Sequence, residues 1–210
     1  MSILIQRFLV AAVCLFSMAK GADEFPPPGF TELSSDTSPM RSFKIIHYKR
    51  DPNDFSSDSQ IWLQGLQPEF KTQLLFTHNN RAWWLISDDE DYIAINYHEG
   101  STDGLLHIFV RGKDGIYTEK KKEYRDVAQK LMTTQLKLKK MPDFDHLYCY
   151  GTAWLRNGVL LAHLNGHYSG ENYLEEWYFL YDVKNDRFSW DLSKVNQGAF
   201  SLVKHPESRK

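Results

Sequence analysis

The feature that most constrains the fold is an alternation between short apolar runs and turn-forming residues. Runs such as "FKIIHY", "AWWLI", "YIAINYH" and "LLHIFV" are rich in aromatic and β-branched side chains. They are bounded by Gly, Asn, Asp and Pro, as in "KDG" and "RNG", where glycine adopts positive φ without steric cost. Short runs between such turns are typical of antiparallel strands and hairpins. The sequence therefore predicts an all-β fold.

One segment departs from this pattern and predicts a single inserted helix over residues 122–140. Several apolar residues share one helical face, namely Val127, Leu131 and Leu138, with Tyr124 and Ala128 beside them. Lysines near both ends favour a solvated helix that covers one edge of a sheet. The alternative is that these lysines dock on an acidic partner or on an anionic membrane surface.

An internal repeat organises the predicted strands. When "AWWLISDDEDYIAINYHEGSTDGLLHIFV" is set against "TAWLRNGVLLAHLNGHYSGENYLEEWYFLY", His98 falls opposite His167. Each copy predicts a four-stranded antiparallel meander. The two copies cover residues 81–119 and 148–192, and a weaker copy over residues 43–76 matches the last three strands of the unit.

Each unit resembles a blade of the WD-type and related periplasmic β-propellers. The resemblance lies in "DDEDYIAINYHEGSTDGLLHIFV", where a tight polar turn leads to an apolar strand, a histidine-containing loop and a further strand, and in the closing hairpin "YDVKNDRFSWD". It implies propeller-like sheets and a binding or assembly role. Two or three units are visible, whereas closed propellers have about four or more blades. We therefore expect an incomplete propeller, with a β-sandwich or barrel as the alternative.

The N-terminal residues have the pattern of a secretory signal. Arg7 precedes the apolar run "FLVAAVCLFSM", which is too short to span a bilayer, and small residues follow at Ala19 and Gly21. We expect residues 1–21 to be a signal peptide and the protein to be periplasmic or secreted in a bacterium. After cleavage Cys149 would have no cysteine partner, so it is expected to be a small buried apolar residue.

The rest of the chain divides into a β domain and two polar ends. Residues 22–42 are rich in Pro, Ser and Thr, which predicts a disordered linker, and residues 204–210 form a similar tail. The β domain then covers residues 43–203. The acidic run "SDDED" at residues 87–91 lacks the ligand spacing of a calcium loop and is interpreted as a solvated hairpin turn.

Two equivalent loops carry the residues best suited to bind a ligand. If the repeats are blades, the loops at residues 98–103 and 167–172 lie on one rim and gather their polar side chains there. Nearby rings that could stack on sugars or peptide aromatics are Tyr97, Tyr168, Tyr173 and Trp177. Alternatively, the histidines and serines only stabilise their own turns. The candidate ligand-binding residues are His98, Glu99, Ser101, Asp103, His167, Tyr168 and Glu171.

No sequence motif establishes a reaction. The chain lacks HExxH, paired CxxC, GxSxG and phosphate-loop patterns, so no metal or cofactor is expected. A net charge of -2 gives no reason to expect nucleic acid as a partner. We expect an exported, non-enzymatic binding or assembly module of the cell envelope, with a protein or glycan ligand or a second copy of the chain as partner, and without stable membrane insertion after signal cleavage. The alternatives are a hydrolase of envelope glycans or peptides and a structural subunit that pairs through sheet edges.

Overall fold

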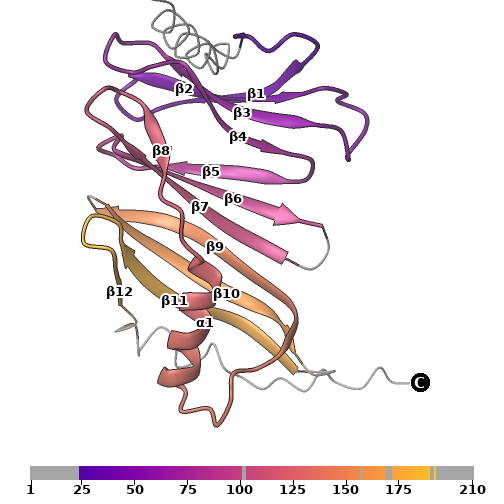
Figure 1. Ribbon diagram of the computed structural model, residues 1–210, viewed down its shortest axis with the longest axis vertical. Helices are drawn as coiled ribbons and strands as arrows, with labels where there is room; N and C mark the ends of the chain where they lie inside the picture. Colours follow the sequence, from indigo (N-terminus) through magenta and orange to yellow (C-terminus); the bar gives the residue numbers. More distant parts are fainter. Residues whose placement is uncertain (1–23, 101–102, 157, 169–171, 190–191, 193–210) are drawn as a thin grey trace, which may run out of the picture.

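The computed structural model describes residues 24–100, 103–156, 158–168, 172–189 and 192. The predicted signal peptide and the C-terminal tail lie outside these residues. Within the described part, antiparallel sheets and one helix make up the regular structure and no sheet closes into a barrel (Figure 1). The predicted all-β class with one inserted helix is therefore confirmed.

The strands form three successive four-stranded antiparallel meanders. The first contains β1 (Thr31–Thr37), β2 (Phe43–Lys49), β3 (Ser59–Gly65) and β4 (Gln73–His78). The second contains β5 (Ala82–Ile86), β6 (Tyr92–Glu99), β7 (Asp103–Arg111) and β8 (Tyr117–Glu119). After α1 (Tyr124–Gln135), the third contains β9 (Phe144–Arg156), β10 (Val159–Tyr168), β11 (Asn172–Asp182) and β12 (Arg187–Ser189).

The second and third meanders are joined into one sheet, whereas the first forms a sheet of its own. The junction is a short parallel pairing in which Asp103 and Gly104 of β7 lie opposite Leu147 and Tyr148 of β9. Further along the same edge, β7 pairs with β8 instead. The helix α1 lies against β7, β9 and β10, in front of the third meander in Figure 1.

Strand β1 corrects the expectation of a disordered linker over residues 22–42. All of its side chains are exposed, and backbone pairing with β2 holds it in place. Because main-chain hydrogen bonds need no apolar side chains, "TELSSDT" has no hydrophobic alternation from which a strand could be predicted. The first meander accordingly has four strands rather than the three predicted over residues 43–76, and the third begins at Phe144 rather than Tyr148.

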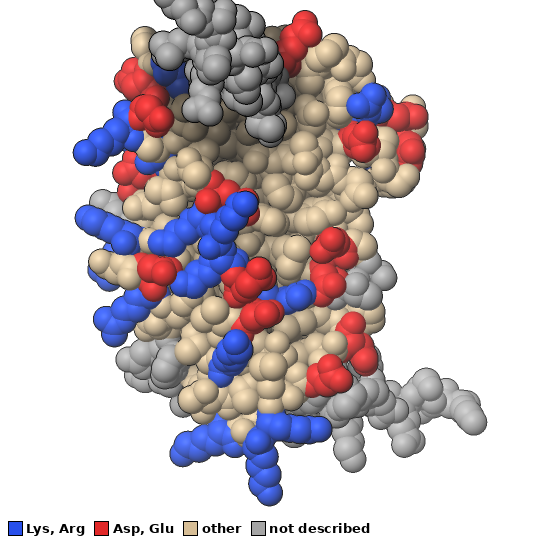
Figure 2. All heavy atoms as spheres, viewed as in Figure 1, with Lys and Arg blue, Asp and Glu red and all other residues tan. Residues whose placement is uncertain are grey.

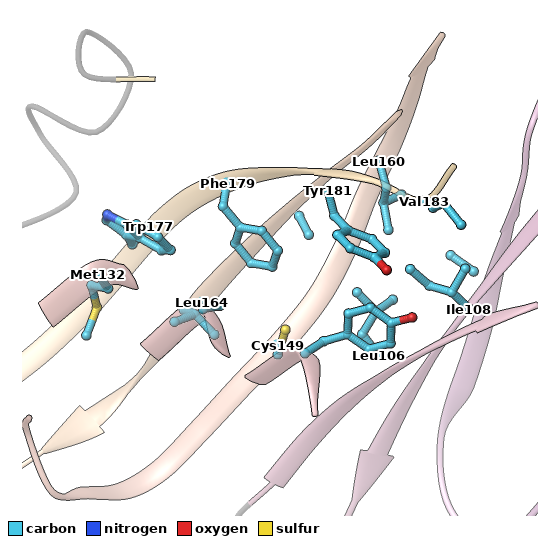
Figure 3. Packing of buried hydrophobic residues seen from close by; sticks show 14 of the residues in the cluster. Leu106, Ile108, Met132, Cys149, Leu160, Leu164, Trp177, Phe179, Tyr181 and Val183 are labelled. Atoms are coloured by element: carbon cyan, nitrogen blue, oxygen red, sulfur yellow. The ribbon is translucent and has the colours of Figure 1, made fainter. Parts of the chain in front are cut away.

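Two apolar layers pack the meanders against one another. The first and second meanders meet through a cluster that includes Phe43, Ile45, Ile61, Leu63, Ile93, Ile95 and Phe109. The second meander, the third meander and α1 share a larger cluster, into which Trp177, Phe179 and Tyr181 of β11 project (Figure 3). Strand β6 is buried on both faces, since Ile93 and Ile95 belong to the first cluster and Ala94 to the second.

The helix is shorter than predicted and buries a different face. Its buried residues are Tyr124, Ala128 and Met132, spaced at i, i+4 and i+8, whereas Leu138 lies beyond the end of the helix. The predicted face centred on Val127 and Leu131 is therefore wrong by part of a turn. Cys149 lies fully buried in the same cluster, and burial raises the pKa of its thiol to about 12, as expected for a small buried residue.

The lysines that flank α1 have different surroundings. Lys122 lies 2.5 Å and Lys120 3.7 Å from Asp186. The lysines that follow the helix are exposed, and positive side chains project from the molecule below α1 in Figure 2. Within the described residues, no helix combines the length and the apolar character needed to cross a membrane.

The acidic turn between β5 and β6 is only partly solvated, which corrects the sequence interpretation. Glu90 is fully buried, and its carboxylate accepts a hydrogen bond from the Met40 N–H at 2.7 Å. The Tyr117 hydroxyl donates to the Glu90 carbonyl oxygen, while Asp91 pairs with Arg111 at 2.5 Å. The turn therefore helps to hold the first meander against the second.

Candidate functional site

The seam between the second and third meanders is held by a few specific hydrogen bonds. The buried side-chain amide of Asn96 donates to the Gly151 carbonyl oxygen at 2.9 Å and accepts from the Gly151 N–H at 2.7 Å. The indole N–H of Trp154 donates to the Leu85 carbonyl oxygen at 3.1 Å. These bonds fix β9 across β6 and β5.

A pocket of about 280 Å³ opens beside these contacts, and we call it the seam pocket. Its lining residues are Arg81, Trp83, His98, Tyr148, Tyr150 and Asn165. The first three come from the second meander and the others from β9 and β10. Residues distant in the sequence meet here because β9 crosses the second meander.

Aromatic rings form the walls of the seam pocket and support one another. The rings of Trp83 and Tyr150 have centroids 4.8 Å apart. His98 stacks on Tyr148 at 5.3 Å, and Tyr148 stacks on Tyr150 at 5.9 Å. Since alternate residues of a strand share a face, Tyr148 and Tyr150 project to the pocket while Cys149 points into the core.

Polar groups stand beside these rings. The Tyr150 hydroxyl lies 2.7 Å from Nδ1 of His98, so the two groups share a hydrogen bond, and burial raises the pKa of Tyr150. The side-chain oxygen of Asn165 is buried and has no hydrogen-bond partner among the described residues. Buried amide oxygens normally accept a hydrogen bond, so the Asn165 oxygen can accept one from a ligand.

The aromatic surface continues along the outer face of the third meander. His163 lies 6.1 Å from Tyr150 and 5.6 Å from Tyr178 between ring centroids, and its Nδ1 is 2.9 Å from the Thr152 hydroxyl. Burial lowers the pKa of His163. This face is therefore an extended surface of histidine and tyrosine side chains.

The structure places the two repeat-equivalent histidines apart on this surface. His98 lines the seam pocket, whereas His167 is exposed on β10 with its ring 4.6 Å from Tyr173 and 6.1 Å from His146. Strands β7 and β9 lie between β6 and β10, which corresponds to a lateral separation of about 14 Å. The two histidines therefore do not line one pocket.

The other predicted site residues lie outside the seam pocket or outside the described part. Glu99 is exposed at the end of β6. Asp103 begins β7 and forms an ion pair with Arg125 of α1. Ser101, Glu171 and the side chain of Tyr168 fall outside the described residues.

None of the rings expected to stack on a ligand is among the described residues that line the seam pocket. Trp177 is fully buried, and its N–H donates to Gln135 at 2.6 Å. Tyr97 faces the first meander, with its ring 5.5 Å from Phe76. The sequence reasoning missed Trp83, Tyr148 and Tyr150, although the alternation in "HLYCYG" already separates two tyrosines from Leu147 and Cys149.

Comparisons with protein-family models, with curated proteins and with solved structures return no match for this chain. Within the described residues, no three His, Cys, Asp or Glu side chains are grouped so that they could hold a metal ion.

Proposed function

We propose that this protein is an exported binding module of the cell envelope and that the seam pocket binds a saccharide unit. The observation that carries this proposal is the wall formed by Trp83, Tyr148 and Tyr150 next to hydrogen-bonding groups. A pyranose ring has an apolar face of C–H groups and a rim of hydroxyls. It can therefore lie on an aromatic ring while exchanging hydrogen bonds with Arg81 and Asn165.

The arrangement favours binding because the rings are held before a ligand arrives. Tyr and Trp side chains have only two χ angles, and here they contact one another, so little further freedom is lost on binding. The pocket volume of about 280 Å³ suits a small unit, since ligand pockets commonly measure about 300–1,000 Å³. The histidine and tyrosine surface along the third meander offers contacts for neighbouring units of a chain.

The predicted signal peptide supports the location, because polysaccharides are abundant in the cell envelope. A hydrolase would need two carboxylates that face one cleft. No carboxylate of the described residues lines the seam pocket, so we propose binding rather than a reaction at this site.

The experiment is a glycan-array screen of the purified protein, followed by calorimetric titration of the strongest binder. We expect Trp83→Ala and Tyr150→Ala to weaken binding about 10–30-fold, since each removes a ring of the wall. Leu155→Ala is the matched control, because Leu155 is 53% exposed on β9 and does not line the pocket. Unchanged binding by the Trp83 and Tyr150 variants, or no binding by the wild type, would contradict the proposal.

A further inference from the structure

Lys49, the last residue of β2, is a buried lysine without an ionic partner in the part of the chain that the structure describes. It is only 8% exposed, and among the described residues no carboxylate forms an ion pair with it. Its Nζ lies 5.5 Å from the centre of the Phe55 ring. A lysine is rarely buried without a partner, because its charge loses hydration that only an anion or strong acceptors can replace.

Lys49 lines a cavity of about 560 Å³ at the edge where the first and second meanders adjoin, and we call it the cation pocket. Arg81 lines it as well, and this arginine is exposed and has no ion pair within the described part of the chain. The remaining lining residues are Leu33, His47, Phe55, Ser59, Asn80, His98 and Gly100. The pocket thus combines two positive charges with hydroxyl and amide donors, and no described carboxylate lines it.

Strand pairing and backbone hydrogen bonds fix the main chain at both positions. Lys49 alternates with His47 and Ile45, so these side chains face the second meander, and Lys49 lies opposite Ser59 in the pairing of β2 with β3. The Arg81 carbonyl oxygen accepts from the His98 N–H at 2.9 Å, and the Arg81 N–H donates to the side chain of Asn80 at 2.8 Å.

The neighbouring titratable groups do not neutralise the pocket. Burial, together with His78 and Lys49, lowers the pKa of His47 to about 4, so His47 is uncharged at neutral pH. Asp58, which precedes Ser59, pairs with Arg50 at 3.4 Å. The two cations therefore remain available to an anion.

We propose that the cation pocket binds an anionic group, a carboxylate or a phosphate, and that this group belongs to the saccharide held in the seam pocket. The two pockets share Arg81 and His98, so one ligand can reach both. The planar guanidinium of Arg81 can hold two oxygens of such a group, while Lys49 acts as a point charge. The ligand is then an acidic saccharide; this assignment rests on the proposed function, whereas anion binding in the cation pocket does not.

The first experiment measures thermal unfolding in inorganic phosphate against chloride of equal ionic strength. We expect a tenfold excess of phosphate over its Kd to raise the Tm of the wild type by about 3–6 °C. Lys49→Met should have a higher Tm than the wild type in chloride, because an unpaired buried charge is removed, and should not respond to phosphate. Lys44→Met, on the same strand but on the opposite face, is the control and should respond like the wild type. If Lys49→Met lowers the Tm in chloride and retains the phosphate response, Lys49 has a structural role and the anion site is excluded.

The second experiment titrates glucose, glucuronate and glucose 6-phosphate, which share a ring and differ at one substituent. We expect the two anionic sugars to bind at least about tenfold more tightly than glucose, an advantage that Lys49→Met removes. The tighter of the two identifies the anion. Trp83→Ala should weaken all three while leaving the phosphate response intact.

Two outcomes separate anion binding in the cation pocket from the acidic-saccharide assignment. If phosphate stabilises the protein but neither anionic sugar binds more tightly than glucose, the anion site is separate and the acidic-saccharide assignment is overturned. If no sugar binds, either in the glycan-array screen or in this titration, while the phosphate response depends on Lys49, the proposed function fails and the anion pocket stands.

Discussion

The second and third meanders have the same strand order but different surroundings. In the second, β6 is covered on both faces, by the first meander on one side and by the third on the other. In the third, β9 buries Leu147 and Cys149 while Tyr148 and Tyr150 stay partly exposed on its outer face. A covered position must be apolar to contribute to packing, so polar aromatic side chains collect where the stack of meanders ends. The repeat builds the scaffold, and the unequal covering of its copies creates the seam pocket.

The same difference separates His98 from His167. Both lie in the second strand of their meander. His98 contacts Tyr150 because β9 of the third meander crosses β6, whereas β9 pairs with β10 as its neighbour in the same sheet and leaves His167 exposed. Equivalent positions in a repeat therefore do not have equivalent chemistry. Substitutions at the seam and at the interface of the first and second meanders can show which contacts make the two differ.

The largest effect is expected for Asn96→Ala at the seam. This substitution leaves the N–H and the carbonyl oxygen of Gly151 without their partner. Each unsatisfied buried group costs about 1–3 kcal/mol, so the free energy of unfolding should fall by about 3–4 kcal/mol. Urea unfolding measures it, with Asn165→Ala as the control that removes a side chain whose oxygen has no hydrogen-bond partner within the described part of the chain. Equal losses in both variants would show that Asn96 does not hold the seam.

A smaller effect is expected for Gly166→Ala in β10. A Cβ atom there would lie 2.1 Å from the His146 carbonyl oxygen, so the backbone of β9 must move, at a cost of about 2–3 kcal/mol. At Gly104 of β7 a Cβ atom would instead meet the ring end of Tyr150 at 2.4 Å. Gly104→Ala should therefore cost less stability but displace a wall of the seam pocket and weaken saccharide binding. If the two variants lose the same stability and both bind normally, the pocket does not depend on the Tyr150 ring position.

The fold could be predicted where side-chain patterns report on burial. Apolar runs and turns locate β2 to β7, but β1 is held by main-chain bonds alone and leaves no such pattern. The helix was predicted, but its buried face differs from the predicted one. Met132, and not Leu138, completes the buried row of side chains with Tyr124 and Ala128. Local periodicity allows several overlapping stripes, and only the packing partner selects one.

The site was predicted less well for a related reason. His98 was predicted because its loop corresponds to the loop of His167 in the internal repeat. Tyr148 and Tyr150 were not, because the path of β9 across β6 is set by long-range contacts such as that of Asn96 with Gly151. Lys49 gave no signal either, since its burial depends on the stacking of two meanders. Which face of a strand stays open is a property of tertiary structure, and one strand sequence does not contain it.

The smallest effect is expected on acidification, which should lower the stability at the interface of the first and second meanders rather than at the seam. His47 and His78 lie at that interface with ring centroids 5.0 Å apart, and burial lowers the pKa of both. For His47 the pKa falls from 6.5 to about 4, so the unfolded chain binds the proton more readily than the folded protein. The stability that neutral His47 contributes is present above pH 6.5 and is lost as the pH falls toward 4.

After solvent screening is allowed for, this loss should be about 1–2 kcal/mol, measured by urea unfolding between pH 7 and about pH 4.5. His47→Phe keeps an aromatic ring and removes the titrating group, so its unfolding free energy should fall less steeply over the same range. Because His78 and Lys49 lie beside His47, part of the slope should remain in the variant. A slope identical to that of the wild type would mean that acid acts elsewhere, and the two interfaces would then not differ in the way that their buried histidines indicate.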